Sequence, residues 1–173
     1  TPRRNLRTPH RPTPDTMRAV ATLASVAALA LLATAAAGSI TDCGAATAKA
    51  HFSSLTITPD PPVKGKETVL NATGTVSEVA TGGKYNIAVS LDKAQLYTHS
   101  GNMCGQDVIN LPLGFGTITY NGPACPTTSG GAFDVGISLI LPTAAPSGNY
   151  DLKITGTDTS STAVYCIDGS FKL

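Results

Sequence analysis

The sequence predicts an all-β domain, an immunoglobulin-like antiparallel β-sandwich of two sheets. Beyond Gly38, apolar and polar residues alternate along several short segments, and no long window has a helical repeat. Clusters of Gly, Pro, Asn and Ser separate these segments, as expected for turns. We expect roughly seven or eight strands in about 130 residues, which is the size of an immunoglobulin-like sandwich.

Four segments carry apolar residues at every second position, which is the pattern of a strand with one buried face. The first two lie within residues 85–91 and 132–141, and the others within residues 150–155 and 165–171. The apolar members of these rows are Tyr85, Ile87, Val89 and Leu91; Phe133, Val135, Ile137, Leu139 and Leu141; Tyr150, Leu152 and Ile154; and Tyr165, Ile167 and Phe171.

A further strand is oriented by the sequon Asn71-Ala72-Thr73, which is an acceptor sequence for N-glycosylation. A glycan on Asn71 requires this side chain to face solvent. Leu70 and Ala72 would then point into the core, because successive side chains of a strand alternate between faces.

The N-terminal region is predicted to be a targeting segment that is not part of the folded domain. Residues 17–37 begin with Met-Arg, continue as an uncharged Ala/Leu/Val run and end in small residues, as secretory signal peptides do. Cleavage after Ala37 is favoured and cleavage after Ala35 is the second choice, with an uncleaved membrane anchor as the alternative. Residues 1–16 are interpreted as translated upstream sequence or a disordered extension, which leaves residues 38–173 as the mature domain.

The charge balance excludes two classes of protein. Only 13% of residues are charged and the formal net charge is +1, so the chain is no disordered polyelectrolyte. It also lacks the strongly basic face on which nucleic-acid binding depends, and we expect no nucleic-acid partner.

Four cysteines follow the predicted signal peptide, and an even number in a secreted chain implies disulfides. Spacing alone leaves all three pairings open. The chain has no C-x-x-C motif and its three histidines are scattered, so we expect no metal site. The cysteines are Cys43, Cys104, Cys125 and Cys166.

The sequence contains no recognisable catalytic motif. The sequence contains neither G-x-S-x-G nor H-E-x-x-H. Asp92 and Asp107 flank His99, but the adjacent Ser100 has no nucleophile motif around it. We therefore predict no catalytic residue, no enzyme activity and no cofactor.

Five motifs, each weak alone, occur in an informative order. They are residues 42–44 (DCG), residues 55–66 with their Pro/Lys-Gly turn, Cys125-Pro126, residues 146–154 (PSGNYDLKI) and residues 165–171 (YCIDGSF). In this order, the mature chain resembles the ML lipid-recognition domain family. The resemblance implies disulfides between Cys43 and Cys166 and between Cys104 and Cys125.

The resemblance further implies a lipid-binding and lipid-transfer protein. It would hold a sterol or phospholipid in an apolar cavity between the sheets and deliver it to membranes through transient contact. A membrane protein could also serve as the acceptor of the lipid. We expect a monomer, secreted or in the endolysosomal or vacuolar lumen. Two alternatives stay open, namely a lipid-recognising or adhesive β-sandwich that acts through a protein partner, and a small secreted enzyme or enzyme activator.

The inward rows supply the candidate site. The residues expected to line the cavity are Leu70, Ile87, Val89, Leu91, Phe133, Val135, Ile137, Leu152, Ile154, Tyr165 and Ile167. Those expected at its entrance are Leu96, Tyr97, Leu113, Phe115, Ile118 and Tyr150. Several entrance residues lie in an apolar insert between Cys104 and Cys125, which would form a lid, a membrane-touching loop or an extra hairpin.

Overall fold

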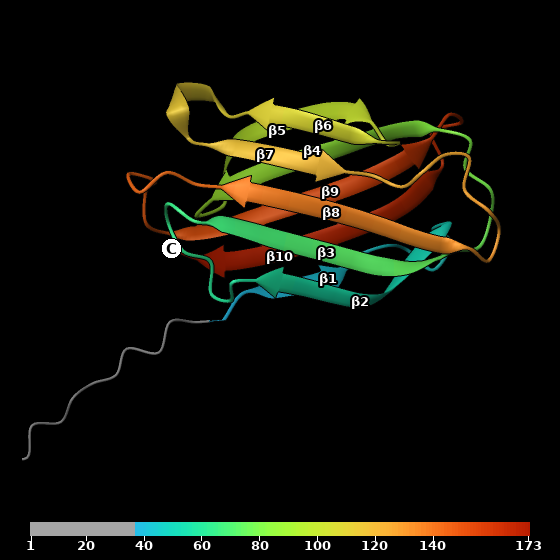
Figure 1. Cartoon of the computed structure of the whole chain (residues 1–173), viewed down its shortest axis with the longest axis horizontal. Helices are drawn as coiled ribbons and strands as arrows, with labels where there is room; N and C mark the ends of the chain where they lie inside the picture. The colour runs from blue at the N-terminus through green and yellow to red at the C-terminus, as the bar shows by residue number, and fades with distance from the viewer. Residues whose placement is uncertain (1–36) are drawn as a thin grey trace, which may run out of the picture. The chain divides into compact units, whose positions relative to one another are not determined.

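The computed structural model describes residues 37–173. The predicted extension over residues 1–16 and, apart from Ala37, the predicted signal peptide over residues 17–37 lie outside this range. The described residues form ten strands and one 3-10 turn (Figure 1). They are β1 (Ser39–Asp42), β2 (Ala50–Thr58), β3 (Glu67–Val76), β4 (Gly83–Leu91), β5 (Ala94–Asn102), β6 (Gln106–Asn110), η1 (Pro112–Gly114), β7 (Thr117–Asn121), β8 (Ala132–Ile140), β9 (Asn149–Asp158) and β10 (Ala163–Lys172).

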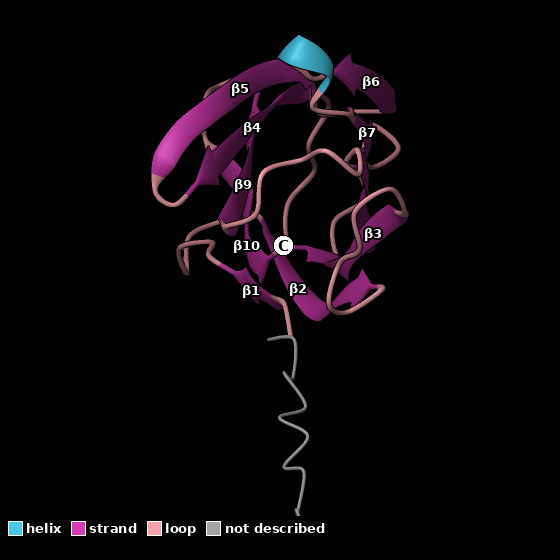
Figure 2. Cartoon of the chain, turned by 90° about the vertical axis from the view of Figure 1, so that its left-hand side faces the viewer, coloured by secondary structure: helices cyan, strands magenta, loops and turns pink. Residues whose placement is uncertain are grey.

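The strands form two five-stranded sheets. One has the order β1-β10-β9-β4-β5 and the other the order β2-β3-β8-β7-β6, and neighbouring strands are antiparallel. Figure 2 shows the sheets as opposite walls, with η1 at the edge between β5 and β6. The prediction of an antiparallel β-sandwich is confirmed.

Alternating residues point into the space between the sheets, as their spacing predicts. On β8, the inward residues Phe133 and Val135 are buried, whereas Asp134 between them is exposed. On β3, Leu70 and Ala72 are buried and Asn71 between them is exposed, which is the orientation expected from the sequon.

The structure has more strands than the sequence predicted, because edge strands lack a clear apolar row. An edge strand contacts the core along only part of its length, so β5 carries mostly polar and exposed residues. The insert between Cys104 and Cys125 forms β6, η1 and β7, which pair from Gln106 with Asn121 to Asn110 with Thr117. The insert thus contains the extra hairpin, one of its three predicted forms.

Four large aromatic residues fill the space between the sheets away from η1. Tyr85, Tyr120, Tyr165 and Phe133 are each at most 1% exposed. The rings of Tyr85 and Tyr120 stack with centroids 3.9 Å apart, and the rings of Phe133 and Tyr165 lie 5.5 Å apart. Such contacts contribute beyond the burial of apolar area.

The hydroxyl groups of these tyrosines are hydrogen-bonded. Tyr120 donates to the carbonyl oxygen of Met103 at 2.9 Å, and the hydroxyl oxygens of Tyr120 and Tyr165 lie 2.8 Å apart. Since Tyr120 uses its proton on Met103, Tyr165 donates to Tyr120. Burial raises the pKa of Tyr120 to about 12 and that of Tyr165 well above its usual range.

Two disulfides close the structure. Cys43 after β1 is bonded to Cys166 on β10, and Cys104 before β6 is bonded to Cys125 after β7. These are the pairings that the family resemblance implies. The first ties an edge strand to its neighbour, and the second ties the ends of the β6–β7 hairpin together.

Across residues 37–173, none of the helical structure is of a length and apolarity that would allow it to cross a membrane.

The two disulfides are expected to stabilise the domain unequally. The chain-entropy model gives about 5 kcal/mol for the 123-residue separation of Cys43 and Cys166, and about 3 kcal/mol for the 21-residue separation of Cys104 and Cys125. Replacing each pair with alanine should therefore lower the free energy of unfolding more for the first pair. Urea titrations followed by circular dichroism measure this, and a larger loss for Cys104 and Cys125 would contradict the prediction.

The buried tyrosines are expected to make the domain sensitive to alkali. The pKa of Tyr120 is about 12 when folded but about 10 when unfolded, so the unfolded chain loses its proton first as pH rises. The stabilisation is fully present below pH 10 and is lost towards pH 12, by an amount on the order of 3 kcal/mol for this group.

Urea titrations at a series of pH values measure this loss, with Tyr120→Phe as the control. The variant keeps the ring without the titrating hydroxyl, so its free energy of unfolding should fall less between pH 10 and 12. Equal pH slopes for both proteins would exclude Tyr120 as a source of the effect.

Candidate functional site

An apolar cleft of about 150 Å³ opens between the sheets beside η1. A narrower cavity of about 10 Å³ adjoins it on the inner side and shares four of its lining residues. The cleft residues are Val89, Leu96, Tyr97, Leu111, Pro112, Leu113, Phe115, Leu141 and Tyr150. The inner cavity is lined by Val89, Leu111, Ile118, Ile137, Leu139, Leu141, Tyr150, Asp151, Leu152 and Phe171.

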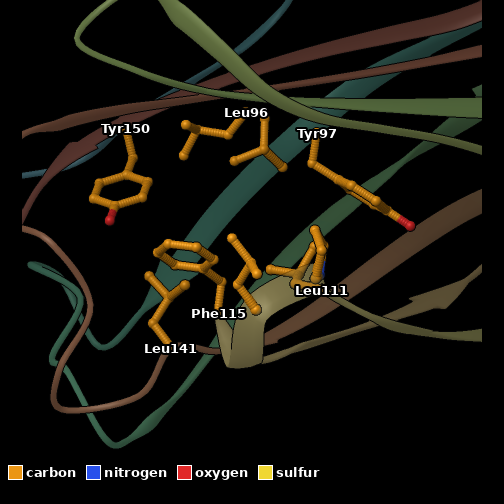
Figure 3. A pocket seen from close by; sticks show the side chains of 9 residues that line it. Leu96, Tyr97, Leu111, Phe115, Leu141 and Tyr150 are labelled. Atoms are coloured by element: carbon orange, nitrogen blue, oxygen red, sulfur yellow. The ribbon is translucent and has the colours of Figure 1, made fainter.

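The two walls of the cleft come from different sheets. Val89 on β4, Leu96 and Tyr97 on β5, and Tyr150 on β9 belong to one sheet. The opposite wall consists of residues 111–115, which connect β6 to β7, and of Leu141 directly after β8. Figure 3 shows Leu96 and Tyr150 facing Phe115 and Leu141 across the cleft.

The turn at the mouth is shaped by its sequence. The N–H of Phe115 donates to the carbonyl oxygen of Pro112 at 3.1 Å, and Leu113 has a φ of 57°. Gly116 has a φ of 111°, and a Cβ there would lie 1.9 Å from the carbonyl oxygen of Ile140. The turn brings Phe115 into the cleft wall while leaving Leu113 93% exposed at the rim.

The cleft is electrically neutral. None of its nine lining residues carries a charge, and its polar side-chain atoms are the two tyrosine hydroxyls. The hydroxyl of Tyr150 donates to the carbonyl oxygen of Pro146 at 3.0 Å, and burial raises the pKa of Tyr150 above its usual value. An apolar guest would therefore meet no unpaired charge in the main cleft.

The predicted entrance residues come together. Five of the six line the cleft, and Ile118 lines the inner cavity instead. Three predicted lining residues also reach these cavities: Val89 contributes to both, and Ile137 and Leu152 to the inner one.

The other eight predicted lining residues lie outside both cavities, where the facing side chains meet and leave no room. Alternation identifies which residues point between the sheets, but not whether the gap between them is filled. These residues are Leu70, Ile87, Leu91, Phe133, Val135, Ile154, Tyr165 and Ile167; all are buried except Leu91, which packs partly buried against the core.

Sequence reasoning missed three residues of the cleft. Leu111 and Pro112 lie in the insert, and their position at a hairpin tip follows only from the pairing of β6 with β7. Leu141, directly after β8, continues the alternating apolar row of Phe133 to Leu139, and its position in that row could have identified it. The inner cavity adds Leu139, Asp151 and Phe171.

The histidine considered for catalysis lies in a different arrangement. Nε2 of His99 is 3.1 Å from a carboxylate oxygen of Asp107, which also accepts a hydrogen bond from Tyr85. These two contacts, with Tyr85 the larger cause, hold the pKa of Asp107 below its usual value. Ser100 accepts a hydrogen bond from Asn86 and, as the next residue on β5, points to the opposite face.

This geometry assembles no Ser–His–Asp triad, because the serine and the histidine face apart. Asp92, the other acid near His99 in sequence, instead accepts hydrogen bonds from the backbone and side-chain nitrogens of Asn149. Within residues 37–173, no group of three or more His, Cys, Asp or Glu side chains is placed to hold a metal ion.

Comparison with known proteins identifies the family. The family model described as the ML domain matches residues 37–173. The Dictyostelium discoideum protein named "Putative phosphatidylglycerol/phosphatidylinositol transfer protein 2" is 30% identical over 125 residues, which cover 72% of this chain and 79% of that protein. The phosphatidylglycerol/phosphatidylinositol transfer protein of Mycosarcoma maydis is 26% identical over 132 residues, which cover 75% of this chain and 63% of that protein.

Two solved structures share the fold. A Niemann-Pick type C2 protein from Japanese carpenter ant superposes with a TM-score of 0.54 at 13% identity, covering 78% of this chain and 98% of that one. Chicken MD-1 complexed with lipid IVa superposes with a TM-score of 0.51 at 15% identity, covering 78% of this chain and 88% of that one. Because the family model spans the whole described domain, the chain belongs to the ML domain family.

Proposed function

We propose that this protein binds a membrane lipid, a sterol or a phospholipid, in the cleft beside η1 and exchanges it with membranes. The observation that carries the proposal is the cleft itself: a cavity between two sheets, lined by apolar and tyrosine side chains and open at one end. Relatives named as phosphatidylglycerol/phosphatidylinositol transfer proteins support a role in lipid transfer.

Burial of hydrocarbon supplies the binding energy. Each methylene that leaves water for an apolar site contributes about 0.8 kcal/mol. Association itself costs on the order of 4–15 kcal/mol, so the guest must bury several methylenes to bind at all. The uncharged lining favours such a guest, because it imposes no desolvation cost on a charged protein group.

Transfer requires the mouth to reach a membrane. Leu113 is 93% exposed and Leu96 is 45% exposed, and both line the cleft. Burying one leucine side chain in the bilayer contributes about 1.5–3 kcal/mol, which is enough for transient contact but not for stable anchoring. We propose that the protein acts as a monomer and that it can hand its lipid either to a membrane directly or to a membrane protein.

The disulfides support an oxidising compartment, outside the cell or in the endolysosomal or vacuolar lumen. The exposed side chain of Asn71 is accessible to glycosylation. We propose a binding function without catalysis, since the cleft lining contains no acid, base or activated nucleophile.

Filling the cleft is expected to abolish lipid uptake. Leu96→Trp places a larger side chain in the cleft wall at a position that is 45% exposed, so the fold should tolerate it. Val108→Trp is the matched control, because Val108 is 57% exposed on β6 and lines neither cavity.

Uptake is measured with a fluorescent phospholipid and a fluorescent sterol, and mass spectrometry of organic extracts identifies lipid that copurifies with the folded protein. The control should bind as the wild type does. A wild-type protein that contains no lipid and takes up neither probe would refute the proposal and favour a β-sandwich that acts through a protein partner.

Replacing the exposed leucine is expected to slow transfer more than it weakens equilibrium binding. Leu113→Asp places a charge at the rim that resists entry into a bilayer, while most of the cleft wall is unchanged. The rate of lipid transfer between vesicles should fall by a larger factor than the affinity for lipid in solution, because Leu113 forms only part of the cleft rim. An unchanged transfer rate would exclude Leu113 from the membrane contact.

A further inference from the structure

We propose that the cleft selects its lipid by the end of a single hydrocarbon chain and excludes the fused-ring body of a sterol. The reason is a layer of three buried tyrosines that closes the space between the sheets behind the cleft. This inference rests on the proposed function and narrows its ligand class.

The size of the cleft favours a slender guest. Its volume of about 150 Å³ resembles that of apolar cavities that hold a benzene molecule. The adjoining inner cavity adds only about 10 Å³. The space accommodates the last carbons of one chain, whereas the rigid ring system of a sterol would require the cleft walls to move apart.

The tyrosine layer lies directly behind this space. Ile118, which lines the inner cavity, and Tyr120 are successive inward residues of β7. Tyr120 pairs across the sheet with Ile137, another inner-cavity residue. A chain that advances past Ile118 thus meets the ring of Tyr120.

Each tyrosine of the layer is matched by a glycine. An added Cβ on Gly156 would lie 2.1 Å from the ring of Tyr165, and one on Gly101 would lie 2.6 Å from the ring of Tyr85. An added Cβ on Gly122 would lie 2.7 Å from the ring of Tyr120. At Gly156 and Gly101 a larger side chain would collide with a tyrosine ring, whereas at Gly122 it would first meet the carbonyl oxygen of Met103, 2.0 Å away. Glycine at these positions thus leaves room for the three rings as they lie.

Hydrogen bonds hold the layer in place. Tyr120 is bonded to Met103 and Tyr165, and Tyr85 donates to Asp107. Moving these rings aside to admit a larger guest would break the bonds and leave buried hydroxyl groups unpaired, which is unfavourable. Displacing the layer is therefore unfavourable, and it forms the floor of the cleft.

The neutral lining also determines where the lipid headgroup lies. Since none of the nine cleft residues is charged, a charged headgroup stays outside in water, and the protein makes no charged contact with it inside the cleft. A phospholipid enters by the end of one chain. Affinity should then depend on the chain and only weakly on the headgroup.

The test is displacement of a fluorescent lysophosphatidylcholine from the purified protein. Lysophosphatidylcholine and lysophosphatidylglycerol of equal chain length should compete almost equally, and cholesterol, which can place only its short branched side chain in the cleft, should compete more weakly than either. Affinity should rise about fourfold per methylene in the shortest chains and then level off once the chain end reaches the tyrosine layer.

A pair of variants tests the floor. Ile118→Ala enlarges the space in front of Tyr120, so affinity should keep rising up to a longer chain length before it levels off. Val76→Ala is the control, because Val76 is equally buried, lines neither cavity and lies on β3 beyond the position that pairs with Phe133; it should leave the chain-length profile unchanged.

Stoichiometric binding of cholesterol, or affinity that keeps rising with chain length, would overturn this inference while leaving the proposed function intact. Failure of both lipid classes to bind would overturn both. If a variant fails to fold, as judged by circular dichroism, the competition series on the wild-type protein still decides between these outcomes.

Discussion

The packing of large aromatic side chains between the two sheets is the constraint on which the rest of this structure depends. Two sheets pack about 10 Å apart, and side chains from both must fill the space between them. Tyr85, Tyr120, Tyr165 and Phe133 fill it in one part of the sandwich. Beside η1 the inward aliphatic and aromatic side chains leave the space incompletely filled, so the cleft lies there.

One hairpin supplies part of one cleft wall and the exposed tip at its mouth. The segment between Cys104 and Cys125 supplies β6, η1 and β7, and thereby part of the cleft wall, the exposed tip and one tyrosine of the floor. The disulfide closes the base of this hairpin, while glycines at its turn allow a tight chain reversal. Part of the cleft wall and the exposed tip therefore belong to a single element closed by a disulfide.

Family membership and ligand class come from different features of the molecule. The strand order and the motifs that define the ML domain fix two sheets and their connections. The depth of the space between those sheets depends on a few inward side chains and on the glycines opposite them. Relatives with the same fold can thus differ in ligand when these residues differ, since a fold sets where a site lies and its side chains set what fits.

Local chemistry was sufficient to predict the all-β class, the inward rows and the exposed side of Asn71, because alternation and turns depend on neighbouring residues. The short edge strands and the extent of the cavity could not be obtained this way. Phe133 and Val89 have the same alternating signature, yet Phe133 is enclosed by facing rings and Val89 borders a cleft. Whether an inward residue meets a partner or an empty space depends on side chains distant in sequence, and only the tertiary structure brings these together.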